Sequence, residues 1–134
     1  MIYTNNSKYK VYFYRNSNTK LVPVLNYIQQ LSVKEKIKIN VYVKFLRDHD
    51  GHLDEPYSRY IGSGIRELRI DFSKNRHRIF YITVQGKKII LLHAFLKRTP
   101  KTPKQEINKA LENLEDYKIN KNLIEYENEY KKEE

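Results

Sequence analysis

Apolar and polar residues alternate in some stretches of the chain and recur with helical spacing in others. The predicted strands are residues 8–15, 65–72, 76–84 and 87–96, and the predicted helices are about 23–30, 33–49 and 104–118. This order, β-α-α-β-β-β-α, is typical of an α+β fold. We expect two helices on one face of a small, mostly antiparallel sheet, followed by a C-terminal helix.

Helix boundaries are marked by capping residues. Pro23 lies in the first turn of the first helix, where its missing N–H costs nothing. Ser32 followed by Glu35 predicts a capping box at the start of the second helix, and Gly51 is a suitable stop. The apolar stripe predicted for the second helix consists of Ile37, Val41, Tyr42, Phe45 and Leu46.

The three later strands follow one another closely. Turns at 73–75 and 85–86 predict consecutive antiparallel hairpins, and residues 53–64 are predicted to be a loop ending in a Gly62-Ser63-Gly64 turn. In the strand 65–72, alternation places Leu68, Ile70 and Phe72 on one face and Glu67, Arg69 and Asp71 on the other. The strand 87–96 does not alternate, which favours a central strand buried on both faces.

Residues 1–134 are predicted to form a single domain, as their number alone favours. The segment 97–104 holds two prolines and ends the sheet. Residues 119–134 are rich in both charges, and their pattern leaves three possibilities open: an extension of the last helix, another helix, or a frayed tail.

Composition excludes several classes of protein. The chain has no cysteine, which rules out a disulfide scaffold, a cysteine-ligated zinc site and a cysteine nucleophile. The sequence lacks an apolar run of bilayer-spanning length and a secretory signal at its start. We therefore expect a cytoplasmic protein with no membrane partner.

Charge points to a polyanionic partner. Lys and Arg number 26 against 16 Asp and Glu, a net charge of +10. Within 59–101 the only acidic residues are Glu67 and Asp71, against eleven basic ones. Such a basic body is typical of proteins that bind nucleic acid, although charge also serves solubility, and both interpretations stay open.

Arginines and lysines gather on the three later strands. Arginine offers a planar fork of donors that matches phosphate, and a metal-free ribonuclease needs cations together with an acid and a base. No metal or other cofactor is expected, because Asp48-His49-Asp50-Gly51-His52 lacks the remaining ligands of known metal motifs. The cations are Arg66, Arg69, Arg76, Arg78, Lys97 and Arg98, and the nearby acid–base groups are Glu67, His77, Tyr81 and His93.

Each acid–base group also has a purely structural interpretation. Glu67 could form a salt bridge with Arg69, and His93 could be a hydrogen-bonded core residue. Tyr81 could be a packing residue, and His77 could lie at a hairpin edge.

Five motifs in order resemble the RelE/ParE toxin superfamily, specifically the phage-related, HigB-like branch of type II toxin–antitoxin systems. The resemblance covers about residues 40–118. The motifs are Lys44-Phe45-Leu46 followed by Gly51, Leu53 and Pro56; Gly64-Ile65-Arg66-Glu67-Leu68-Arg69; Arg78-Ile79-Phe80-Tyr81; Leu91-Leu92-His93-Ala94-Phe95-Leu96-Lys97-Arg98-Thr99; and Thr102-Pro103 with Glu106, Ile107 and Ala110.

The resemblance implies a RelE-like, microbial-RNase-type fold and a ribosome-dependent, metal-independent endoribonuclease that cleaves translated mRNA. It also implies a HigA-like helix-turn-helix antitoxin, with operator DNA bound only through the antitoxin complex. The implied catalytic positions are Arg69, Arg78, Lys97 and Arg98, with Glu67 and His93 ranked second. The expected RNA contacts are Arg66, Arg76, His77, Tyr81 and Lys101.

Two other functions stay open at this point. A ParE-type protein would bind and poison DNA gyrase without catalysis, using the same basic strands as a binding face. An inactive, nucleic-acid-binding prophage protein would have no effect on growth, and a shared fold alone does not separate these possibilities.

Overall fold

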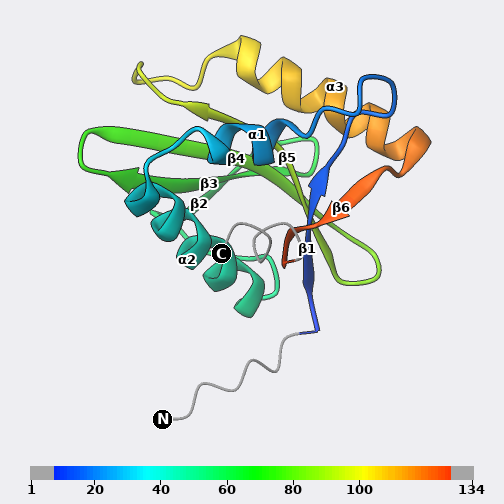
Figure 1. Ribbon diagram of the computed structural model, residues 1–134, viewed down its shortest axis with the longest axis horizontal. Coiled ribbons are helices and arrows are strands. Elements are labelled where there is room, and N and C mark those ends of the chain that lie inside the picture. The colour runs from blue at the N-terminus through cyan, green and yellow to red at the C-terminus, as the bar shows by residue number, and fades with distance from the viewer. Residues whose placement is uncertain (1–7, 128–134) are drawn as a thin grey trace.

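The computed structural model describes residues 8–127, which form three helices and one six-stranded sheet (Figure 1). The strand order across the sheet is β2-β3-β4-β5-β1-β6. The elements are β1 (Lys10–Tyr14), α1 (Pro23–Gln29), α2 (Val33–Asp48), β2 (Ser58–Gly62), β3 (Ile65–Phe72), β4 (Asn75–Val84), β5 (Lys88–Leu96), α3 (Lys104–Asn120) and β6 (Leu123–Glu125).

The predicted α+β class and the consecutive hairpins are confirmed. β3, β4 and β5 pair antiparallel in chain order, and β1 lies parallel to β5 on its other side. β5 is therefore a central strand, and its residues from Ile89 to Phe95 are all buried. That burial agrees with its unbroken apolar sequence.

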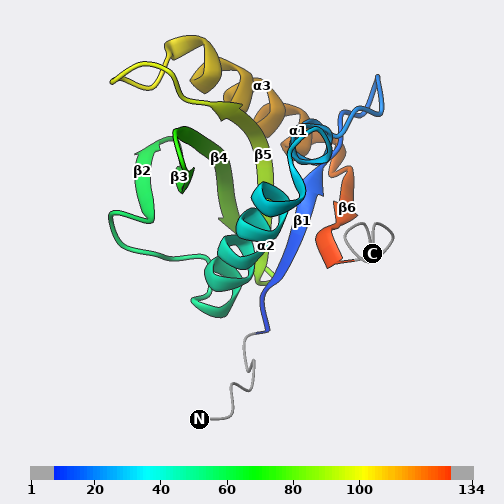
Figure 2. The same ribbon diagram turned by 60° about the vertical axis from the view of Figure 1, so that its left-hand side comes forward.

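The sheet separates two apolar clusters. α1 and α2 cover one face, where Ile28, Ile39 and Leu46 pack against Ile70 and Ile79 and their neighbours. α3 covers the other face through Ala110, Leu114 and Tyr117, which pack against Phe80, Leu92 and Phe95. In Figure 2 the sheet curves around α2, while α3 lies above it. The predicted pair of helices on one face is thus confirmed.

Two strands escaped sequence prediction. Residues 58–62, expected to belong to a loop, form β2 and pair antiparallel with β3, and Gly62-Ser63-Gly64 is the turn between them. Residues 123–125 are neither helix nor tail but form β6, which pairs antiparallel with β1. Residues 128–134 of the predicted extension lie outside the described part.

The apolar stripe predicted for α2 is partly wrong. Ile37 and Val41 are 59% and 56% exposed, whereas Ile39, Val43 and Leu46 are buried against the sheet. The helix carries apolar residues on two opposite sides, and only one side can face the sheet. The capping box of Ser32 and Glu35 is confirmed.

Gly51 follows the C-terminal end of α2 and has a backbone conformation that favours glycine. Its φ is 79°, and its N–H donates to the carbonyl oxygen of Leu46 at 2.9 Å. None of the helices within residues 8–127 combines the length and apolar composition needed to cross a bilayer.

A cationic cluster as the candidate functional site

Basic side chains from three strands meet beside the α3-covered face of the sheet. Arg69 of β3 and Arg78 of β4 are cross-strand partners, and Arg78 is paired in turn with Phe95 of β5. Because side chains alternate along a strand, Lys97 continues on the same side as Phe95. We call this group the cationic cluster, and its members are Arg59, Glu67, Arg69, Arg78, Lys97 and Thr102.

Glu67 is the buried centre of the cationic cluster. Glu67 is only 1% exposed, and each of its carboxylate oxygens accepts a hydrogen bond. Oε1 accepts a hydrogen bond from Arg69 Nε at 3.1 Å and lies 3.9 Å from Arg78 Nε. Oε2 accepts from the Thr102 hydroxyl at 3.2 Å. A buried carboxylate needs such partners, so Glu67 fixes the positions of the groups around it.

Arg78 is a buried guanidinium held from several directions. Its Nη1 donates to Asp71 Oδ1 at 2.7 Å and to the carbonyl oxygen of His77 at 3.0 Å. Its Nε is buried and has no hydrogen-bond partner among residues 8–127. The guanidinium is therefore held through Nη1, while its Nε has no hydrogen bond to the described residues.

Lys97 lies where the cluster opens to solvent. Burial lowers its pKa; Glu67 opposes that change, and the cations Arg78, Arg69 and Arg59 add to it. A lowered pKa makes the neutral amine more accessible, which a lysine needs in order to accept a proton.

Two pockets adjoin Lys97. One, of about 430 Å³, is lined by Arg59, Lys101 and Thr102 together with the apolar side chains of Ile61, Pro100 and Ile107. The other, of about 470 Å³, is lined mainly by polar and basic residues: Lys74, Asn75, Arg76, Leu96, Lys97 and Arg98. A polyanion crossing Lys97 would meet cations on both sides.

The structure brings together four of the predicted catalytic residues, Glu67, Arg69, Arg78 and Lys97. Three further predicted residues, Arg76, Arg98 and Lys101, line the adjoining pockets. His93 lies on the same face of the sheet, on the far side of Phe80 from Glu67. It is buried, and its Nε2 lies 3.2 Å from Glu106 Oε2 on α3. Burial lowers the pKa of His93, and Glu106 opposes that change.

Three predicted RNA contacts lie on the opposite, α2-covered side. Arg66 donates from Nε to Ser58 Oγ at 3.0 Å, and that hydroxyl is hydrogen-bonded to the buried Tyr81 at 2.8 Å. Burial raises the pKa of Tyr81. His77 is buried, with its Nε2 2.6 Å from Glu35 Oε2 and its Nδ1 2.7 Å from the Tyr27 hydroxyl. These side chains are engaged in internal contacts away from the cationic cluster.

Sequence reasoning missed Arg59. This arginine lies on β2 directly opposite Glu67 in the register, on the same side of the sheet. It is also one of the cations that act on Lys97. Because residues 53–64 were expected to be a loop, the sequence offered no register that would have placed Arg59 beside Glu67. Thr102 was noted only as part of a motif.

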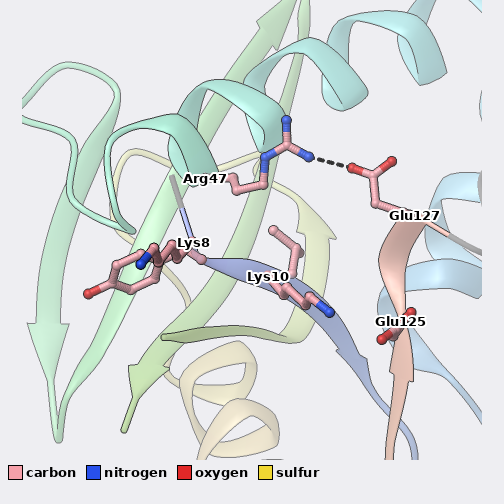
Figure 3. A pocket seen from close by; sticks show the side chains of 7 residues that line it. Lys8, Lys10, Arg47, Glu125 and Glu127 are labelled. Carbon is pink, nitrogen blue, oxygen red and sulfur yellow. Dashed lines mark hydrogen bonds and ion pairs between the residues drawn. The ribbon is translucent and has the colours of Figure 1, made fainter. Parts of the chain in front are cut away.

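A third pocket, of about 380 Å³, lies at the other edge of the sheet (Figure 3). Arg47 and Glu127 form an ion pair of 2.6 Å there, and the pocket is also lined by Lys8, Lys10 and Glu125. Its three cations face two carboxylates, whereas in the cationic cluster four cations surround the single carboxylate of Glu67. Across residues 8–127, no three His, Asp or Glu side chains are grouped so as to hold a metal ion.

The fold and site define a small, basic α+β protein with a carboxylate-centred cluster of cations. The sequence model of the family described as "Phage derived protein Gp49-like (DUF891)" matches residues 26–115, which include the whole cationic cluster. The chain belongs to this Gp49-like family, which is toxin-like and related to the RelE- and HigB-type toxins of toxin–antitoxin systems. The comparison with curated proteins found no match.

Proposed function

We propose that this protein is the toxin of a type II toxin–antitoxin system and cleaves translated mRNA on the ribosome without a metal ion. The cationic cluster is the observation that carries this proposal. It sets two held arginines beside a lysine of lowered pKa. Family membership supports the toxin class and points to an antitoxin as partner.

The cluster supplies the groups that phosphodiester cleavage requires. Arg69 and Arg78 bind the scissile phosphate and stabilise the extra negative charge of the transition state. Neutral Lys97 removes the proton from the 2′-hydroxyl, whose oxygen attacks phosphorus. The P–O5′ bond breaks, the 5′ oxygen takes a proton from water, and a 2′,3′-cyclic phosphate forms.

Glu67 acts in this proposal as a positioning residue and not as the base. Its oxygens already accept hydrogen bonds from Arg69 and Thr102, and it is almost fully buried. It holds the arginine fork at an angle fixed before RNA arrives, so that less ordering is needed in the transition state.

The ribosome and mRNA are the proposed targets, and a HigA-like helix-turn-helix antitoxin is the proposed regulator. The net charge of +10 favours approach to ribosomal RNA. Operator DNA would be bound only through the complex, by the helix-turn-helix domain of the antitoxin.

The test is controlled expression without antitoxin, followed by genome-wide mapping of RNA 5′ ends. The wild type is compared with the Arg69→Ala/Arg78→Ala variant and with Lys104→Ala/Lys118→Ala. The latter removes the same charge from exposed positions of α3. We expect new ends within translated frames for the wild type and the α3 variant only.

Other outcomes would overturn the proposal. Growth arrest with intact mRNA and an induced SOS response would identify a gyrase poison of the ParE type. Normal growth on expression of the folded wild type would identify an inactive nucleic-acid-binding protein.

A further inference from the structure

α2 carries a second apolar face, which is largely exposed to solvent. Val33, Ile37 and Val41 are 71%, 59% and 56% exposed, and they recur every four residues. On the opposite side of the helix, Ile39 and Val43 are fully buried. α2 therefore has the inner face that the sheet requires and an outer apolar ridge that the fold does not.

The ridge has the geometry of a helix-packing surface. Side chains four residues apart form the ridges that fit into the grooves of a neighbouring helix. Single exposed apolar residues are normal on protein surfaces, but three aligned over more than two turns form a continuous patch. Such patches mark sites at which another molecule binds.

Charges beside the ridge specify the partner. Lys34 and Lys44 are exposed on the same side of α2. The acidic side chains of the helix are less available, because Glu35 is turned inward and buried, and Asp48 is 21% exposed and lies 3.4 Å from Arg47 Nε. A second copy of this chain would bring the same exposed lysines to the interface, which is unfavourable. An acidic partner would instead place carboxylates against both lysines.

We propose that the outer face of α2 binds an acidic, amphipathic helix of a second protein. The apolar side of that helix would pack on Val33, Ile37 and Val41, and its flanking carboxylates would pair with Lys34 and Lys44. This inference goes beyond the ribonuclease proposal, because none of these residues belongs to the cationic cluster. Membrane-surface helices characteristically carry Trp, Phe or Leu on the apolar face, and this ridge has only valine and isoleucine.

Absence of cysteine makes the proposal directly testable by protection from labelling. Ile37→Cys places one thiol on the ridge, and Ile119→Cys places one on α3 at a position that is 70% exposed. In the full-length chain alone, both thiols should react with a maleimide at similar rates. A much slower reaction at position 37 would mean that another part of this chain covers the ridge, and would overturn the proposal.

The probe is a synthetic helical peptide with isoleucine at every fourth position, flanked by glutamates. We expect saturating peptide to slow labelling at position 37 about tenfold or more and to leave position 119 unchanged. The same peptide with lysines in place of its glutamates should give no protection. In the Lys34→Glu/Lys44→Glu background this preference should reverse.

Three further outcomes would overturn the proposal. The first is no protection at saturating acidic peptide. The second is protection that rises with the concentration of the protein alone, which would identify a second copy as the occupant. The third is protection by vesicles of phosphatidylglycerol and phosphatidylcholine, which would identify a membrane surface. None of these readouts depends on RNA cleavage.

Discussion

Glu35 joins α2 to the rest of the fold at a buried point, and its protonation should weaken the protein in acid. Its carboxylate accepts from Ser32 Oγ at 2.8 Å and from Asn75 Nδ2 at 3.0 Å, and lies 2.6 Å from His77 Nε2. These contacts lower the pKa of Glu35 from 4.5 to about 2. The hydrogen bond from Ser32 is the largest cause, and the hydrogen bonds from Asn75 and His77 lower the pKa further, while burial opposes the change.

The magnitude follows from the pKa values of the folded and unfolded states. A pKa difference between 4.5 and about 2, at about 1.4 kcal/mol per pH unit, corresponds to about 3 kcal/mol. Because the folded pKa is the lower one, this stabilisation is fully present above pH 4.5. It is lost as the pH falls from 4.5 towards 2.

The assay is urea unfolding followed by far-ultraviolet circular dichroism, since the chain has no tryptophan. Free energies of unfolding are measured from pH 7 to pH 2.5 for the wild type and for Glu35→Gln. The variant has no carboxylate to titrate at this point. We expect the difference between the two proteins to shrink by about 2 to 3 kcal/mol over this range.

Glu115→Gln, at an exposed position of α3, serves as the control. Its difference from the wild type should stay nearly constant with pH, because exposed groups interact weakly. A difference between wild type and Glu35→Gln that also stays constant would refute the reasoning. It would show that the carboxylate of Glu35 has the same pKa in the folded and unfolded chains.

Three further predictions concern the fold and the cluster. Gly51→Ala should lower the free energy of unfolding, measured in urea, by about 2 to 4 kcal/mol, since φ is 79° and the new Cβ would lie 2.3 Å from Thr83 Cγ2. Gly86→Ala has a similar φ of 85° but its new Cβ would meet only Lys88 Cε at 3.9 Å, so it should cost less. If neutral Lys97 is the base, the rate of cleavage on programmed ribosomes should rise with pH below the pKa of Lys97. Lys97→Arg should be slow at every pH, because arginine stays protonated. A wild-type rate that does not depend on pH would contradict this role. Thr102→Val should slow cleavage about fivefold, because it loses one hydrogen bond worth roughly 1 kcal/mol. Thr102→Ser keeps the hydroxyl and should retain activity. Equal cleavage rates for the two variants would show that the Thr102 hydroxyl has no role in the site.

The long, regular elements of this fold were predictable from sequence, and the short edge strands were not. β3, β4 and β5 carry eight to ten residues each with clear turns between them. β6 has three residues, and β2 has five and follows Pro56, so neither produces a periodic pattern. Edge strands of this kind are defined by their neighbours, which lie far away in sequence in the case of β6.

The candidate site was predictable only as far as alternation along single strands allowed. Glu67 and Arg69 were placed correctly on one face of their strand by periodicity, whereas the position of Arg78 opposite Arg69 required the register between β3 and β4. The same periodicity puts Arg66 on the other face from Glu67, so its separation from the cluster was already contained in the sequence. Arg59 required the unpredicted pairing of β2 with β3.

The pairing of β1 with β6 determines when the sheet can be completed during synthesis of the chain. Phe13 and its register partner Ile124 are separated by almost the whole described chain, and Phe13 also packs on the buried ring of Tyr126 at 5.0 Å between ring centroids. During synthesis the edge of β1 therefore stays uncovered until residue 126 has been made. A nascent chain cannot complete its sheet early, and contacts of such long range also slow folding after release.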